Sequence, residues 1–201
     1  VAIHGAYSAL IAAAEFFSLR NKYKDEFPFA DTKELYGLYV KELFRFDQLY
    51  RHFCEQADLA EGAGWDLLKP LRDDIEAAYC HWYLVRLGID WGKCLDSGLL
   101  EHWRIEGVPN QHGFYKRHVL PQININDRTR VFVVISDAFR FEAAQELHMQ
   151  LNGEYRLQAE MDTQLGVLPS YTALGMAALL PGKKLSYGQS GEVMLDGRPT
   201  A

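Results

Sequence analysis

The segment Arg130–Leu147 constrains the fold of this chain more than any other, because an uninterrupted apolar run leads into a helical pattern. Residues 131–135 are VFVVI, a composition typical of a strand that is buried on both faces of a parallel sheet. Asp137 follows this run, and apolar residues then recur at helical spacing from Phe141 to Leu151. The segment therefore predicts a buried strand, a turn that carries one carboxylate, and a helix.

The C-terminal part of the chain continues to alternate between the two patterns. After the helix of residues 141–151, a β-like segment is expected over residues 155–163, a second helix is expected to begin with Ser170 as its cap, and a further strand is expected over residues 192–197. This β-α-β-α-β order predicts an α/β layer with a mainly parallel sheet and right-handed crossovers. In such a sheet, functional groups collect at the carboxyl ends of the strands, where Asp137 is expected to lie.

The N-terminal part of the chain shows helical periodicity instead. A second helix of this part is expected to begin at Asp31, because Asp31 and Glu34 have the spacing of a capping box. A third helix is expected to begin near Pro70 and to end near Gly88. The first helix is predicted from a stripe of apolar residues at helical spacing: Ile3, Tyr7, Leu10, Ala14 and Phe17.

Composition limits the class of protein. Hydrophobic residues make up 48% and charged residues 24% of the chain, as in ordinary globular proteins, and the net charge of −6 argues against a broad nucleic-acid-binding surface. The three cysteines show no C-x-x-C spacing, which favours free thiols and a cytoplasmic location, and the apolar run over residues 9–17 is too short to span a membrane.

Because the chain starts on Val1 within a helical pattern, we expect an excerpt of a longer protein. We predict a helical domain over residues 1–120 and the first, truncated part of an α/β domain over residues 121–201.

Two short elements carry the residues that could perform chemistry. Asp137, at the end of a strand, could hold a cation or could only cap the following helix. In LGVLPSYTALGMAALL, Ser170 and Thr172 stand at the start of a helix, whose unpaired N–H groups favour phosphate oxygens. A hydroxyl there becomes a nucleophile when a metal lowers its pKa. In the alternative interpretation, Ser170 caps the helix and Thr172 is incidental. The sequence has no P-loop, no G-x-S-x-G elbow and no H-E-x-x-H motif.

Together, VFVVISDAFRFEAAQEL, LGVLPSYTALGMAALLPG and VMLDG resemble the PglZ family, a branch of the alkaline phosphatase superfamily found in bacterial phage-defence (BREX) loci. The resemblance covers roughly residues 112–201 and implies that two metal ions flank a phosphoryl group during the reaction. By this resemblance, Asp137 is the metal ligand after the first strand. Thr172 is the nucleophile, because it ends a P-x-x-T pattern shared with the phosphodiesterase branch, and Ser170 is the alternative nucleophile. Arg140 belongs to the motif and is expected to pair with a nearby acid or carbonyl.

The chain departs from this superfamily pattern in its metal ligands. The superfamily completes its metal sites with Asp and His residues downstream of the nucleophile, but here no His follows His148 and the only Asp after Thr172 is Asp196. His148 falls inside a predicted helix and is not expected to be a ligand. Because catalytic sites usually use about three protein ligands, we expect a divalent metal to bind this chain weakly or not at all. Zinc is the first expectation, with manganese or magnesium as alternatives.

The function implied by the resemblance is that of a metal-dependent phosphohydrolase or phosphodiesterase, including a nuclease, which acts in phage defence on phosphate esters, nucleotides or nucleic acid. The excerpt alone is expected to be inactive, and other defence proteins are its expected partners. Two alternatives stay open. The protein could be a catalytically dead scaffold whose aromatic-rich helical part docks other proteins, or a plain α/β module that binds an anion at the helix start near Ser170 without chemistry.

Overall fold

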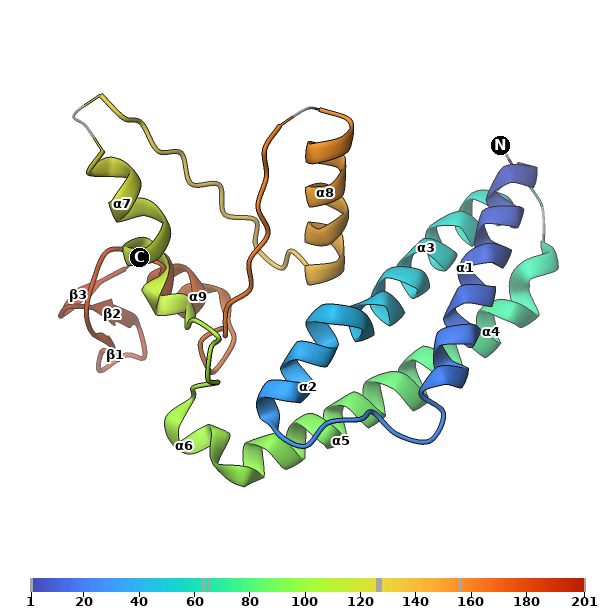
Figure 1. Ribbon diagram of the computed structural model, residues 1–201, viewed down its shortest axis with the longest axis horizontal. Helices are drawn as coiled ribbons and strands as arrows, with labels where there is room; N and C mark the ends of the chain where they lie inside the picture. Colours follow the sequence, from blue (N-terminus) through green and yellow to red (C-terminus); the bar gives the residue numbers. More distant parts are fainter. Residues whose placement is uncertain (1, 63, 65, 126–127, 156, 201) are drawn as a thin grey trace. The chain divides into compact units, whose positions relative to one another are not determined.

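The computed structural model describes residues 2–62, 64, 66–125, 128–155 and 157–200 of the chain (Figure 1). The chain divides into two compact units, and each unit is built from two separate stretches. Unit 1 comprises Val1–Trp103 and Arg140–Met161, and unit 2 comprises Arg104–Phe139 and Asp162–Ala201. The predicted domain boundary at residue 120 stays a prediction.

Unit 1 is helical throughout its described elements. Several of its long helices contain π-helical turns (η1, η3 and η4), and one 3-10 turn (η2) precedes α4. In chain order the elements are α1 (Ala2–Lys22), α2 (Thr32–Leu38), η1 (Tyr39–Leu43), α3 (Phe44–Glu61), η2 (Asp66–Leu68), α4 (Lys69–Ala77), η3 (Ala78–Tyr83), α5 (Leu84–Cys94), η4 (Leu95–Leu99), α6 (Leu100–His102) and α8 (Phe141–Gly153).

Unit 2 combines short helices with a small sheet. Its strands pair antiparallel in the order β1-β2-β3, with Ser186 opposite Met194 in the first pair. Its elements are η5 (Gln111–Gly113, a 3-10 turn), η6 (Tyr115–Val119, a π-helical turn), α7 (Leu120–Ile123), α9 (Thr172–Leu179), β1 (Leu185–Tyr187), β2 (Val193–Leu195) and β3 (Arg198–Pro199).

The helix predicted to start at Asp31 is confirmed, with Asp31 as its N-cap. The backbone N–H of Glu34 donates to Asp31 Oδ1 at 2.8 Å, which pairs one N–H group that the helix itself cannot satisfy. Glu34 Oε2 reaches back to the backbone N–H of Ala30 at 2.7 Å, one residue before the N–H that a regular capping box pairs. The local sequence alone was sufficient to place this helix start.

The first helix is also confirmed, but its buried face differs from the stripe that predicted it. The large residues Ile3 and Tyr7 are 59% and 66% exposed. The buried face is made instead of small residues and Phe16, which pack on α3 (Figure 1). Gly5 shows how close the approach is, because a Cβ there would lie 3.1 Å from the carbonyl oxygen of Gln56. Small side chains let two helix backbones pack closely. The buried residues of this face are Ala6, Ala9, Ala12, Ala13 and Phe16.

The expected helix end at Gly88 is wrong. Gly88 lies inside α5, and the helical chain continues to Gly98, whose φ of 109° breaks it. A glycine within a helix costs only about 1 kcal/mol relative to alanine, so flanking residues that pack well can carry the helix through it. The break needs a positive φ, and Gly98 adopts one without a Cβ clash.

A buried carboxylate lies at the centre of unit 1. Asp47 is 3% exposed and accepts hydrogen bonds from the hydroxyls of Tyr39 at 2.9 Å and Tyr79 at 2.6 Å. The guanidinium of Arg140, from the residue that precedes α8, donates to the same carboxylate at 2.7 Å. Tyr83 completes the surroundings and donates to the carbonyl of Leu43 at 3.0 Å. A buried charge is tolerated when it is paired and hydrogen-bonded in this way.

This cluster makes the stability of unit 1 sensitive to alkaline pH. Burial, followed by the hydrogen bond to Asp47, raises the pKa of Tyr79 from 10.0 to about 12. Burial and the charge of Asp47 also raise the pKa of Tyr39 and of Tyr83. A tyrosine whose pKa is raised by folding stabilises the folded state fully below pH 10, and this contribution is lost as the pH rises toward about 12.

We therefore expect unit 1 to unfold cooperatively as the pH rises above 10, with tyrosinate absorbance at 295 nm appearing together with the loss of helical circular dichroism. A Tyr7→Phe variant is the control, because Tyr7 is 66% exposed and lies outside the cluster, and its profile should match that of the unaltered chain. Full titration of every tyrosine with the helical signal intact would contradict this expectation.

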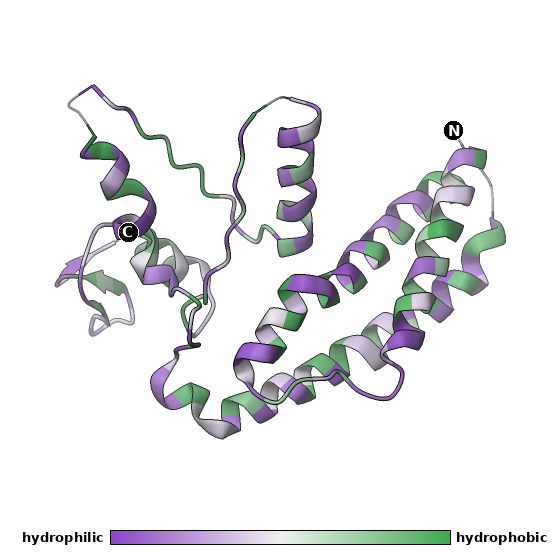
Figure 2. Cartoon of the chain, in the orientation of Figure 1, coloured by the Kyte–Doolittle hydropathy of each residue, from purple (hydrophilic) through white to green (hydrophobic). Residues whose placement is uncertain are grey.

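The mainly parallel sheet predicted for the C-terminal part is not formed by the described residues, whose strands are antiparallel. The apolar run over residues 130–136 is extended but pairs with no strand in the described chain, and Phe132 and Val134 are 84% and 92% exposed. Figure 2 shows this extended, largely apolar trace before α8. A strand needs a hydrogen-bonded neighbour, and the run alone cannot supply one.

The other strand predictions have mixed outcomes. The strand expected over residues 192–197 is confirmed as β2. The β-like segment over residues 155–163 contains no strand in its described part, and Arg156 lies outside the described residues. None of the helices in the described part of the chain has the length and apolar character that crossing a membrane requires.

Candidate functional site

The structure of unit 2 brings Asp137 and Thr172 together. The Thr172 hydroxyl donates a hydrogen bond to Asp137 Oδ2 at 3.0 Å, although the two residues lie 35 positions apart in the sequence. Asp137 lies on the connection that leads to α8, and Thr172 is the first residue of α9. Both side chains are exposed, so the pair is open to a ligand from solvent.

The turn that carries Asp137 has an unusual backbone. Ala138 adopts a φ of 54°, which is uncommon for a residue with a Cβ. Its backbone N–H donates to Asp137 Oδ1 at 3.0 Å, so each oxygen of this carboxylate accepts one hydrogen bond. The turn therefore holds the carboxylate in one orientation and directs Oδ2 at the hydroxyl of Thr172.

Asp137, Ser170 and Thr172 line one open hollow of about 750 Å³. The walls come from four sources: Gln111 of η5, the extended segment before α8, the loop before α9, and α9 itself. This volume falls in the range of typical small-molecule sites. Its lining residues are Gln111, Ile135, Ser136, Asp137, Ala138, Phe139, Gln164, Gly166, Val167, Ser170, Tyr171, Thr172, Gly175, Met176 and Leu179.

Ser170 does not cap the helix as expected. The N-cap of α9 is Tyr171, which makes no side-chain capping hydrogen bond, and the helix begins at Thr172. Ser170 is exposed and is one of the residues that line the hollow. The reason is local: the backbone of Tyr171 is extended, with φ −128° and ψ 156°, so the helical dihedrals start two residues later than the serine. The backbone N–H groups of the first turn therefore have no side-chain acceptor at the cap position.

Arg140 pairs with a nearby acid, as the sequence predicted. It donates to Asp47 at 2.7 Å and to the hydroxyl of Tyr79 at 3.1 Å, and both partners belong to unit 1. The neighbouring Glu142 is fully buried and accepts two hydrogen bonds from Arg51, at 2.8 and 3.0 Å. The charged residues of this motif therefore anchor α8 on α3.

The described residues do not fit a complete metal site. Asp137 supplies a hard oxygen ligand next to a hydroxyl, which is suitable for a divalent cation. No group of three His, Cys, Asp or Glu side chains that could hold a metal ion occurs among the residues that the structure describes. His148 Nε2 donates to the carbonyl of Ala159 at 3.0 Å, within unit 1. Among the described residues, the candidate site thus offers one carboxylate, whereas a catalytic metal site needs about three protein ligands.

Sequence reasoning missed Gln111, a residue in the wall of the hollow. Its side-chain amide donates to the carbonyl of Gly175 at 3.0 Å and accepts from the backbone N–H of Val167 at 3.1 Å. Gln111 stands in a stretch of short, irregular elements with no motif around it, so no local signal distinguishes it. Its importance follows only from long-range contacts.

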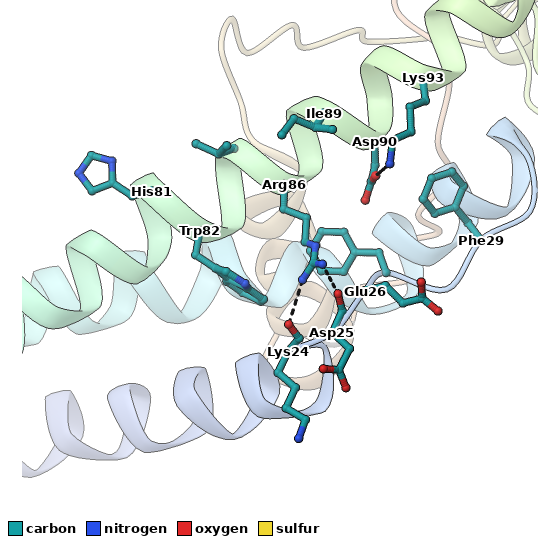
Figure 3. Close-up of a pocket in the computed structure, with 12 residues that line it drawn as sticks. Lys24, Asp25, Glu26, Phe29, His81, Trp82, Arg86, Ile89, Asp90 and Lys93 are labelled. Carbon is teal, nitrogen blue, oxygen red and sulfur yellow. Dashed lines mark hydrogen bonds and ion pairs between the residues drawn. The ribbon is translucent and has the colours of Figure 1, made fainter.

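A second hollow, of about 760 Å³, lies in unit 1 but offers no comparable chemistry (Figure 3). Arg86 donates to the main-chain carbonyls of Lys24 and Asp25, and Lys93 pairs with Asp90 at 2.6 Å. Arg86, Asp90 and Lys93 therefore already have interaction partners within the protein itself. We therefore assign the candidate site to unit 2.

Comparisons with known proteins find one family model and two curated relatives that match this chain. Residues 114–201 match the model of the BREX system PglZ alkaline phosphatase-like domain. The chain is 47% identical over 188 residues to the alkaline phosphatase-like protein BrxZ of Escherichia coli O9:H4 (strain HS). The aligned residues make up 93% of this chain and 22% of that protein. It is 36% identical over 190 residues to the alkaline phosphatase-like protein PglZ of Bacillus cereus (strain H3081.97). This alignment includes 94% of this chain and 21% of that protein.

The chain thus spans about a fifth of the length of the curated relatives that it matches. No solved structure matches it significantly. The resemblance to the PglZ family that the sequence predicted is confirmed.

Proposed function

Because residues 114–201 belong to the PglZ family, we propose that this chain is part of a longer, metal-dependent phosphoesterase that acts in bacterial phage defence. The observation that carries this proposal is the 3.0 Å hydrogen bond from Thr172 Oγ1 to Asp137 Oδ2. An exposed hydroxyl at a helix start, where phosphate oxygens are favoured, and beside a carboxylate is suited to attack on a phosphoryl group.

In the proposed reaction, Thr172 Oγ1 forms a bond to phosphorus while the bond from phosphorus to the leaving oxygen breaks. The leaving oxygen keeps the bonding electron pair and takes up a proton to depart as an alcohol. The Thr172 hydroxyl donates to Asp137 Oδ2, so this carboxylate orients the hydroxyl and accepts its proton as Oγ1 bonds to phosphorus. The proton then passes through solvent to the leaving oxygen. Hydrolysis of the phosphothreonine by water then regenerates the hydroxyl. The N–H groups of the first turn of α9 favour the negative charge on the phosphoryl oxygens.

The proposed cofactor is a divalent cation, with zinc preferred over manganese or magnesium. Asp137 is the ligand that this chain would contribute, and the remaining ligands would come from other parts of the complete protein. A bound cation supplies Lewis acidity and lowers the pKa of a coordinated hydroxyl. Because the described residues lack a full ligand set, this chain alone should bind the metal weakly and be inactive.

The proposed substrates are phosphate esters, including nucleotides or nucleic acid, and the P-x-x-T pattern favours phosphodiesters. We further propose a cytoplasmic location, with other phage-defence proteins as partners. In the complete domain, the extended run over residues 130–136 would gain strand neighbours and join a mainly parallel sheet, since an apolar, exposed segment of this kind is suited to burial in such a sheet.

The proposal is tested with the complete protein that contains this chain. After metal removal with a chelator, hydrolysis of bis(4-nitrophenyl) phosphate should be lost, and added zinc or manganese should restore it. An Asp137→Ala variant should bind the metal at least ~10²-fold more weakly by calorimetry, since loss of even an indirect metal partner costs 10- to 100-fold. Asp162→Ala is the matched control, because Asp162 is an exposed aspartate of unit 2 outside the hollow.

A second candidate function is that of a catalytically inactive scaffold in a defence complex. Exposed apolar residues of the helical unit, such as Tyr7 and Leu67 at 66% and 75% exposure, favour it because they could dock other proteins. The same calorimetric titration separates the two candidates: a complete protein that binds neither zinc, manganese nor magnesium and hydrolyses no phosphodiester would leave the scaffold as the better account.

A further inference from the structure

Gln111 connects the two segments on either side of the candidate nucleophile. Its Nε2 donates to the carbonyl of Gly175, which lies within α9, and its Oε1 accepts from the N–H of Val167, in the loop before α9. Thr172 lies between these two attachment points in the sequence. One side chain therefore joins the loop that leads into the helix to the helix that begins with the hydroxyl.

Gln111 is itself held firmly by its backbone. Its N–H donates to the carbonyl of Leu165 at 2.8 Å, and the N–H of Leu165 donates to the carbonyl of Pro109 at 2.8 Å. These bonds form a short parallel bridge between Asn110 and Leu165, and Leu165 is 5% exposed. The amide is thus presented from a fixed segment and not from a free loop.

The helix needs such a connection. α9 has 8 residues, and isolated helices of this length are marginal in water. Its apolar face packs through Leu174 and Ala177 against Val193 of β2, which buries the helix but provides no directional bond. The hydrogen bonds of Gln111 are directional, so they fix the orientation of α9 and of its first residue.

We propose that Gln111 is a positioning residue for Thr172. By fixing α9, Gln111 holds the Thr172 hydroxyl at the place where it donates to Asp137. This inference rests on the proposed phosphoesterase function. Both halves of the amide are needed, because one donates and the other accepts at the same time. A glutamate at this position keeps the acceptor, but when ionised it has no donor for the carbonyl of Gly175. A methionine keeps the length and loses both bonds.

The experiment uses the complete protein with bis(4-nitrophenyl) phosphate as substrate. Gln111→Met should lower kcat by ~10- to 10²-fold, because a misplacement of about 1 Å costs that much, while KM stays within about 3-fold. Gln122→Met is the matched control, because Gln122 is an exposed glutamine of α7 in the same unit, and it should leave kcat unchanged. A wild-type kcat in Gln111→Met would overturn the proposal.

A second variant distinguishes positioning from a general loss of folding. The activity of Gln111→Glu, relative to the unaltered protein at the same pH, should be low at neutral pH and should recover as the pH falls toward about 5, where a carboxyl next to a carbonyl takes up a proton and becomes a donor. A pH-independent ratio would count against the proposal.

Failure of the proposed phosphoesterase function can be distinguished from failure of the proposed role of Gln111. If the unaltered complete protein hydrolyses no phosphodiester, the function fails, and amide hydrogen exchange still tests the connection. Gln111→Met should then speed exchange along α9, relative to Gln122→Met, and equal exchange in the two variants would overturn the role of Gln111.

Discussion

Replacing Thr172 with alanine in the complete protein should lower phosphodiester hydrolysis by up to ~10⁶-fold, the size of the loss when a hydrolase loses its nucleophile. The reason is geometric: Thr172 carries the hydroxyl that donates to Asp137 in the candidate site. Thr172→Ser keeps a hydroxyl at this position and should retain part of the activity. The measurement is the initial rate with bis(4-nitrophenyl) phosphate at saturating metal.

Two further variants identify the nucleophile. Thr172→Val preserves the shape of the side chain and should be as inactive as the alanine variant. Ser170→Ala should keep activity within a few-fold, because the hydroxyl that donates to Asp137 in the structure is that of Thr172 and not that of Ser170. Mass spectrometry of acid-quenched protein should find the phosphoryl adduct on Thr172. An adduct on Ser170, together with an active Thr172→Ala variant, would reverse the assignment.

The second large effect concerns stability. Asp47→Ala should lower the free energy of unfolding by about 3 kcal/mol or more, because loss of one partner of a buried ion pair leaves the other groups uncompensated. Here those groups are the guanidinium of Arg140 and the buried hydroxyls of Tyr39 and Tyr79. Urea denaturation of this 201-residue chain, followed by circular dichroism, gives the value.

A matched substitution on the surface controls for this effect. Asp73 is an exposed aspartate of α4, so Asp73→Ala should change the free energy of unfolding by less than about 0.5 kcal/mol. A double-mutant cycle with Arg140→Ala should give a coupling energy of about 0.5–3 kcal/mol between Asp47 and Arg140. If Asp47→Ala unfolds at the same urea concentration as the unaltered chain, the cluster does not stabilise unit 1.

The pairing of Arg140 shows what the sequence could and could not predict. Arg140 follows Asp137 by three residues in the sequence, and its ion pair with Asp47 lies within unit 1. The sequence predicted that Arg140 would find an acid or a carbonyl, but it could not identify Asp47. The two residues are 93 positions apart, and only folding brings them together.

In the candidate site as well, the sequence predicted the residues and the structure supplied their contacts. Asp137, Thr172 and Ser170 were selected from local patterns, namely a run that ends at an acid and a helix start that carries hydroxyls. The structure adds that Thr172 contacts Asp137 and that Ser170 does not cap the helix. It also adds Gln111, which carries no local signal because its two partners lie 56 and 64 positions away. The catalytic roles of all these residues stay predictions.

The sequence by itself determined the features that depend on neighbouring residues: the helices of the N-terminal part, the helix cap at Asp31, and the strand that became β2. These features follow from hydrogen bonds and periodicity over a few residues. Only the tertiary structure decided which face of α1 is buried, that the helix continues through Gly88, and that the apolar run over residues 130–136 stays exposed. Each of these depends on which surfaces of distant segments meet, because apolar burial and strand pairing require a partner that no local pattern contains.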